Sequence, residues 1–232
     1  MQKGVFKMNT KMKFNTYRLT LSAIMIALAT ALAVICGLIP GLSLPYGGSF
    51  TIASMLPIVI VAYIFGLKWG LFTSLTYAAI QIILDLIMGK SSVILALFLP
   101  IEEGGQTLVA AISIILLDYV VAYGILFLGG SCRKMKSKTL GLTLGAIIAT
   151  SCRYLAHILS GYIFYGAYAE WFFEENFNPE LGAKILSALD GQVLAIVYSI
   201  IYNGLYMIPE IIITAVCAVI VSRIPQIKAT EL

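Results

Sequence analysis

Charged side chains are scarce in this sequence. They make up 11% of its 232 residues, and none occurs between Leu19 and Lys68, whereas soluble domains carry roughly a quarter. Hydrophobic residues supply 60% of the chain, and the mean hydropathy is +0.98. A water-soluble core of this length would not hide so much apolar surface. The composition therefore excludes an ordinary soluble domain and predicts a protein of the lipid bilayer.

Metal ligands and catalytic groups are also few. The chain has one histidine, and its four cysteines form no CxxC pair. A structural zinc site needs four such ligands, and acid–base or nucleophilic catalysis needs paired groups. No phosphate loop of the GxxxxGK[ST] type occurs either. We therefore expect no metal, no cofactor, no catalytic residue and no ATPase activity in this chain, and we interpret the cysteines as reduced packing residues.

Long apolar stretches indicate about six membrane spans, because each span needs about 20 residues. We place the helices at residues 16–38, 50–67, 69–88, 105–129, 138–166 and 192–222. The expected fold class is an all-α integral membrane protein, a compact bundle of six transmembrane helices. Residues 1–15 would be a cytoplasmic segment, 16–222 a single transmembrane domain and 223–232 a cytoplasmic tail. Because further spans follow, we expect the first apolar run to be a retained helix and not a cleaved signal peptide.

Two connections are less regular. Residues 170–190 are polar and acidic, which predicts a loop. The stretch 89–104 has only 11 uncharged residues between Lys90 and Glu102, too few to span a bilayer. We interpret it as a short re-entrant or interfacial piece, with a seventh helix as the alternative.

The basic residues predict the orientation, because Lys and Arg are retained on the cytoplasmic side. With both termini inside, every basic residue except Lys90, Arg153 and Lys184 lies in the cytoplasm. The net charge of +4 then reflects a basic membrane face, and we expect no nucleic-acid partner.

Polar residues within the spans indicate a site, because each one needs a partner, a cavity or a ligand in hydrocarbon. Asp118 and Tyr119 lie in the fourth helix. The fifth and sixth helices each carry a set of residues at every fourth position, so each set lies along one face of its helix. They are Arg153, His157, Gly161 and Tyr165 in the fifth helix, and Tyr198, Tyr202, Tyr206 and Glu210, beside Asn203, in the sixth. Such a set suits a small, flat, cationic ligand. Aromatic rings would stack on the ligand, and a carboxylate would pair with its positive charge.

Structural interpretations of the same residues remain open. Asp118 and Arg153 would neutralise each other as an interhelical pair, and His157 would bond between helices without touching a ligand. Tyr206 fits the aromatic belt at a membrane surface. Asp85, near a helix end, is expected to be solvated.

The first helix has alanines at 23, 27 and 31. Their spacing of four makes one smooth strip, which allows another helix to pack closely. The strip would serve either packing within the bundle or contact with a partner protein.

Four segments together resemble a known family. They are GGSFTIASMLP at 47–57, LDY at 117–119, RYLAHILSGYIFYGAYA at 153–169 and YSIIYNGLYMIPE at 198–210. In this order they are similar to the thiamine-specific substrate-binding (S) components of energy-coupling factor (ECF) transporters. The alanine strip resembles the pattern by which these subunits contact their transmembrane coupling protein.

The resemblance implies a multi-pass bacterial cell-membrane protein that captures thiamine near the outer face. Energy would come from the coupling protein and two ATP-binding cassette ATPases. The implied substrate-binding residues are Asp118, Tyr119, His157, Gly161, Tyr165, Tyr198 and Asn203, with Tyr46 closing the site, and the implied partner-contact residues are Ala23, Ala27 and Ala31. Two departures are visible, because the acid is often Glu in the family and the aromatic residue at Tyr165 is often Trp.

Three other functions are weighed against this one. The first is an S component for another vitamin or for a thiamine precursor such as hydroxymethylpyrimidine. The second is an intramembrane enzyme that uses Asp118 and His157, although a second catalytic group is lacking. The third is a self-contained proton-coupled carrier, against which the lack of an internal sequence repeat counts.

Overall fold

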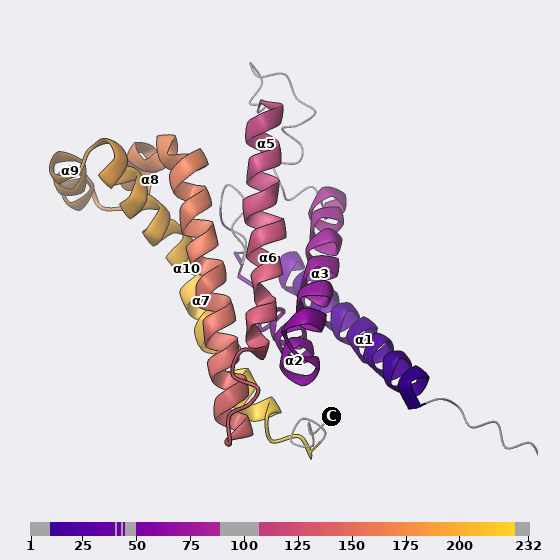
Figure 1. Ribbon diagram of the computed structural model, residues 1–232. Helices are drawn as coiled ribbons and strands as arrows, with labels where there is room; N and C mark the ends of the chain where they lie inside the picture. The colour runs from indigo at the N-terminus through magenta and orange to yellow at the C-terminus, as the bar shows by residue number, and fades with distance from the viewer. Residues whose placement is uncertain (1–9, 40, 43, 45–49, 89–106, 226–232) are drawn as a thin grey trace, which may run out of the picture.

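The computed structural model describes residues 10–39, 41, 42, 44, 50–88 and 107–225, with side chains from Thr16 onward. Every regular element within these residues is a helix (Figure 1). Five helical stretches are long and apolar enough to cross a membrane: Thr16–Leu38, Leu67–Met88, Leu108–Gly130, Lys138–Asn176 and Gly191–Val221. Together with one shorter apolar helix, they confirm the all-α fold class of a membrane protein. The stretch 89–104 lies outside the described residues.

The shorter helix, α2 (Leu56–Phe65), is the centre of the core, and all ten of its residues are buried. It packs against α1 (Thr10–Leu38) and α3 (Leu67–Met88). Ten residues rise only about 15 Å, half of a hydrocarbon layer of about 30 Å. The predicted helix 50–67 was therefore too long at its start. Pro57 explains the boundary, because proline is tolerated only in the first turn of a helix.

The fourth span changes its helical geometry along its length. It runs through α5 (Leu108–Ile115), the π-helical turn η3 (Leu116–Val121), α6 (Ala122–Gly124) and the 3-10 segment η4 (Ile125–Gly130). At its lower end it touches α2 so closely that a Cβ added to Gly129 would lie 2.7 Å from Cγ1 of Val59. Glycine thus allows this close helix contact, which a larger residue would prevent.

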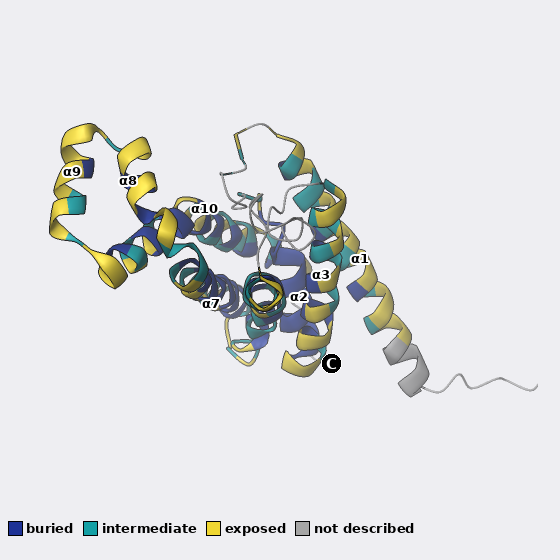
Figure 2. Ribbon diagram, turned by 90° about the horizontal axis from the view of Figure 1, so that it is seen from above, coloured by how far each residue is buried: buried dark blue, intermediate teal, exposed yellow. Residues whose placement is uncertain are grey.

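The last two spans, α7 (Lys138–Tyr165) and α10 (Gly191–Val221), run side by side (Figure 1). The acidic segment between them was predicted as a loop, and this prediction was wrong. After the 3-10 turn η5 (Gly166–Tyr168) it folds as α8 (Ala169–Asn176) and α9 (Pro179–Ala188). The Asn178 side chain caps α9 by accepting the Leu181 amide at 2.7 Å, and Phe172 and Phe173 are buried in a cluster with residues of α10. Seen from above, the pair α8–α9 projects beside the bundle and is largely exposed (Figure 2).

The two ends of the bundle differ in charge. The start of α1, the α2–α3 turn, the η4–α7 turn and the end of α10 lie at one end (Figure 1). This end, called the basic end below, carries Arg18, Lys68, Arg133, Lys134, Lys136, Lys138 and Arg223. The acidic residues of α8 and α9 lie at the other. The assignment of the basic end to the cytoplasm remains a prediction from the distribution of charge.

Candidate functional site

The π-helical turn η3 carries Asp118 and Tyr119. A π turn is a rare interruption of an α-helix, and such turns occur often at functional sites. In this turn the neighbouring side chains of Asp118 and Tyr119 contact different helices. Asp118 contacts α7, whereas Tyr119 contacts α3.

Asp118 is held by two side chains of α7. Its Oδ1 lies 2.9 Å from Nδ1 of His157, and its Oδ2 accepts the Ser160 hydroxyl at 2.7 Å. The side chain of His157 is 9% exposed and that of Asp118 is 21% exposed. Both oxygens of the carboxylate are thus oriented, and yet part of the group remains accessible.

Arg153 defines the tautomer of His157. Its Nε–H donates to Nε2 of His157 at 3.2 Å. Because Nε2 accepts, the ring proton lies on Nδ1 and is donated to Asp118. The guanidinium also lies 4.2 Å from the ring centroid of Tyr123, a cation–π distance. Asp118 and Arg153, both described residues, are not within ion-pair distance, so they do not form the direct pair weighed above. The imidazole of His157 lies between them, because it accepts from Arg153 and donates to Asp118.

The third helix of the site, α10, joins through the amide of Asn203. Its Nδ2 donates to the backbone carbonyl of His157 at 3.2 Å, and its Oδ1 accepts the Tyr206 hydroxyl at 2.6 Å. The Tyr206 ring is 5.9 Å from the imidazole, edge to face, and only 6% exposed. The prediction of Tyr206 as an interfacial belt residue was therefore wrong. It belongs to the site, because α10 turns this face toward α7.

Gly161 makes the approach of α7 and α10 possible. A Cβ at this position would overlap Oγ of Ser199, which itself donates to the Ile158 carbonyl at 2.7 Å. The residue is buried within the helix contact. Its direct contribution to ligand binding remains a prediction, and the geometry adds a packing function to it.

The predicted aromatic residues fall into two places. Tyr198 is 2% exposed and lies in a cluster under α8, with its ring 5.3 Å from Phe172 and 5.6 Å from Tyr202. Tyr165 is half-buried at the last position of α7, 6.4 Å from Tyr168. It lies two turns after His157 and on the same face. Tyr165 is at the end of α7 and Tyr198 is near the start of α10, so both lie toward the end of the bundle that carries α8 and away from the basic end (Figure 1).

Tyr119 and Asp85 make a contact that the sequence did not predict. The Tyr119 hydroxyl donates to Oδ2 of Asp85 in α3 at 2.9 Å. Asp85 is half-buried, so its prediction as a solvated residue was wrong. The phenol that donates to it belongs to the residue next to Asp118 in the fourth span.

The non-helical segment before α2 is attached to α10. Oε2 of Glu210 accepts the backbone N–H of Thr51 at 2.8 Å and its hydroxyl at 3.0 Å. Irregular backbone at membrane depth is tolerated where protein groups satisfy it. Glu210, buried to 1% exposure, supplies that acceptor and fixes the segment, whose Met55 in turn contacts the guanidinium of Arg153.

The other predicted residues are found as follows. Ala23, Ala27 and Ala31 are exposed on α1, as a contact surface requires, whereas their neighbour Ala29 is buried. Tyr46 lies outside the described residues.

The fold and the site together define a class: a multi-pass helical membrane protein with a polar, hydrogen-bonded site between three of its helices. The sequence profile described as thiamine transporter protein (Thia_YuaJ) matches residues 23–105 and 94–171. Over 203 residues the chain is 30% identical to the thiamine transporter ThiT of Bacillus subtilis (strain 168), covering 82% of this chain and 84% of that protein. It therefore belongs to the thiamine transporter family, and the resemblance noted in the sequence is confirmed.

A solved structure supports the fold. ThiT from Listeria monocytogenes superimposes with a TM-score of 0.58 at 20% identity, covering 92% of this chain and 97% of that chain. The family relationship and the apolar helices identify a multi-pass bacterial membrane protein.

Proposed function

We propose that this chain is the substrate-capturing subunit of an ECF-type vitamin transporter and that it binds thiamine from the extracellular side. The observation that carries the proposal is the oriented carboxylate of Asp118, with His157 on one oxygen and Ser160 on the other. It stands in a chain of the thiamine transporter family.

The chemistry of thiamine matches this carboxylate. The molecule has a permanently cationic thiazolium ring and an aminopyrimidine ring, and both are flat. A carboxylate pairs with the cation or accepts from the amine, and charge-assisted bonds of this kind are among the strongest in proteins. Half-buried Tyr165 offers a ring for stacking, and Tyr198 would do so once the cluster under α8 opens to admit the ligand. Asn203 and His157 hold the orientation of the helices around the ligand.

Binding and release are sufficient for this role, and no bond is made or broken. Relatives of the chain are named as transporters. The energy would come from partner subunits, namely a transmembrane coupling protein and two ATP-binding cassette ATPases. The exposed strip of Ala23, Ala27 and Ala31 on α1 is the surface we assign to the coupling protein, because small residues let two helices approach closely.

The test is calorimetric titration of the purified chain in detergent with thiamine, together with quenching of the fluorescence of Trp171 in α8. We expect tight one-to-one binding by this subunit alone. Asp118→Asn keeps the shape but removes the charge, and should weaken binding by about tenfold to a hundredfold, the loss of one charge-assisted bond. The exposed acid Asp190 provides the matched control Asp190→Asn, which should bind like the parent.

Substrate identity is resolved by competition. Hydroxymethylpyrimidine and a panel of other vitamins are added to the thiamine complex, and the tightest competitor defines the substrate. If a monodisperse protein gives no heat with thiamine, the thiamine assignment fails. If Asp118→Asn binds as tightly as the parent, the assignment of the carboxylate fails while the substrate stands.

A further inference from the structure

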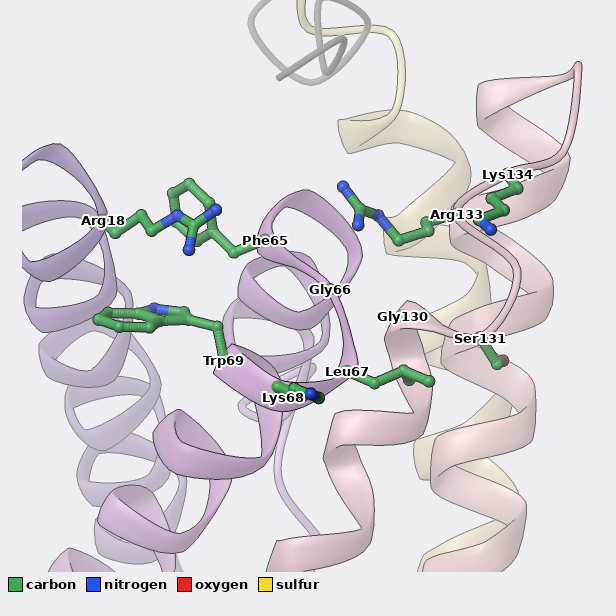
Figure 3. Close-up of a pocket in the computed structure, with 10 residues that line it drawn as sticks. All are labelled: Arg18, Phe65, Gly66, Leu67, Lys68, Trp69, Gly130, Ser131, Arg133 and Lys134. Carbon is green, nitrogen blue, oxygen red and sulfur yellow. The ribbon is translucent and has the colours of Figure 1, made fainter. Parts of the chain in front are cut away.

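A second site is visible at the basic end, remote from the Asp118 cluster. A cavity of about 690 Å³ opens between the start of α1, the α2–α3 turn and the η4–α7 turn (Figure 3). Its described lining residues include four cations, Arg18, Lys68, Arg133 and Lys134, and none of these described residues is acidic. The size falls within the range of small-molecule sites. Four like charges around one cavity favour an anion inside it.

The α2–α3 turn is built around the guanidinium of Arg133. Its Nη2 donates to the carbonyl of Ile64 at 3.0 Å, near the C-terminus of α2, where cations are favoured. Gly66 has a φ of +89°, and a Cβ there would lie 2.8 Å from Nη1 of Arg133. Glycine is thus required both by the conformation and by the space. The guanidinium is held in place beside the cavity and does not extend freely into water.

Aromatic rings position the cation on the opposite side. The guanidinium carbon of Arg18 lies 5.5 Å from the ring centroid of Phe65 and 5.7 Å from that of Trp69. Trp69 is itself fixed, because its Nε1–H donates to the Ser22 hydroxyl at 2.9 Å. Figure 3 shows Arg18 and Arg133 on either side of the α2–α3 turn. The cavity therefore has an apolar wall as well as fixed charge.

The first turn of α3 also favours an anion in this cavity. Leu67, Lys68 and Trp69 begin this 22-residue helix and line the cavity. The Gly70 N–H is bonded back to the Gly66 carbonyl at 2.9 Å. The backbone N–H groups before Gly70 precede the repeating backbone hydrogen bonds of α3. N–H groups at this position of a helix favour the binding of phosphate and other anions.

We propose that this cavity is a binding site for a phosphate group. Planar guanidinium groups and a helix N-terminus recognise phosphate oxygens. Basic pockets between membrane helices accept the headgroups of anionic phospholipids, and Phe65, Leu67 and Trp69 supply an apolar wall beside the charge. The same chemistry would hold a soluble phosphate compound. The lipid and the soluble ligand are distinguished by experiment.

Trp69 provides a probe inside the site, because Trp171 is the only other tryptophan of the chain. The full chain carrying Trp171→Phe is placed in phosphatidylcholine nanodiscs. In one arm a fraction of brominated phosphatidylglycerol is added, with brominated phosphatidylcholine as the reference. In the other arm inorganic phosphate or pyrophosphate is titrated into discs of phosphatidylcholine alone. Quenching or a shift of Trp69 emission reports occupancy.

Two matched pairs of variants separate the cavity from general surface charge. Lys68→Gln/Lys134→Gln removes two exposed cations that line the cavity. Lys136→Gln/Lys138→Gln removes one exposed and one half-buried cation at the same end that are not among its described lining residues. Each cation lost from the cavity should lower the preference for phosphatidylglycerol, or the affinity for phosphate, by about fivefold. The second pair should behave like the parent. Arg133→Gln, checked for intact helicity by circular dichroism, should act in the same direction as the first pair.

The outcomes are distinct. Preferential quenching by brominated phosphatidylglycerol that only the cavity variants lose supports a lipid headgroup in the site. A response to soluble phosphate alone, lost in the same variants, supports the phosphate site and assigns it to a soluble ligand. Equal losses in both pairs of variants, or no response in either arm, overturn the proposal.

Discussion

Glu210 in α10 accepts two hydrogen bonds from Thr51, a residue 159 positions earlier in the chain. One carboxylate oxygen thereby fixes backbone that has left helical geometry at membrane depth. Truncation to alanine would leave the part-buried Thr51 amide without this acceptor.

Glu210→Ala should therefore lower the free energy of unfolding by about 2 kcal/mol, the cost of an unsatisfied buried donor. Thiamine dissociation should also become faster, because the segment that contacts Arg153 through Met55 loses its attachment to α10. Thermal unfolding in detergent and stopped-flow fluorescence measure the two effects. Glu210→Gln keeps a carbonyl acceptor and should lose much less. If the glutamine and alanine variants were equally impaired, the negative charge and not the hydrogen bond would be the essential feature.

The contact between Tyr119 and Asp85 is open to a double-mutant cycle. Tyr119→Phe and Asp85→Asn should each reduce stability, and the double variant should lose less than the sum of the two. We expect a coupling of about 1 kcal/mol, as for a hydrogen bond to a charged group that is half-buried. Chemical denaturation of the four proteins provides the numbers. Strictly additive effects would mean that the two side chains do not interact in the membrane.

Gly161→Ala tests the close approach of α7 and α10. The added Cβ overlaps Oγ of Ser199, so the helices must separate at a cost of about 1–3 kcal/mol. His157 and Asn203 would separate with them, and thiamine affinity should fall. Adding Ser199→Ala removes the overlapping oxygen and should recover part of both losses. The proposed packing function would be refuted by an undiminished melting temperature in the single variant.

Variants of the alanine strip of α1 distinguish thiamine binding by this chain from thiamine uptake by the whole transporter. Ala23→Leu/Ala27→Leu should leave thiamine binding by the purified chain unchanged, because both residues are exposed and on the outside of the bundle. Uptake of labelled thiamine by cells that contain the coupling subunits should fall sharply. The exposed Ala79 of α3 gives the control Ala79→Leu, with normal uptake expected. Equal uptake by all three proteins would assign the strip to lipid contact alone.

The spans could be predicted from the sequence because hydrophobicity alone defines them. Residues 138–166 and 192–222 were expected and α7 and α10 were found at Lys138–Tyr165 and Gly191–Val221. The shared face of His157 and Gly161 also followed from their spacing of four. Periodicity specifies which residues of one helix point the same way, and the structure agrees with it.

What periodicity does not specify is the direction in which a face points. Tyr206 was expected at the membrane surface, and yet its hydroxyl donates a hydrogen bond to Asn203 inside the bundle. Asp85 was expected in water, and yet it meets Tyr119. Both outcomes depend on contacts between helices that are distant in sequence. The π turn at Leu116–Val121 has the same origin, because no local composition distinguishes it from an ordinary helix.

That π turn has a consequence for how the protein tolerates insertions and deletions. A π turn accommodates about one residue more than the α-helical turn in its place. Deleting Val120 would let the segment close into regular α-helix and still cross the membrane. The part with Ala111 and Ile114 would keep its orientation relative to the part with Leu126 and Gly129, because an α-helical turn completes the same rotation with about one residue fewer. The shortened span would therefore still pack on both sides of the turn, and the change would be confined to the turn that directs Asp118 to α7 and Tyr119 to α3.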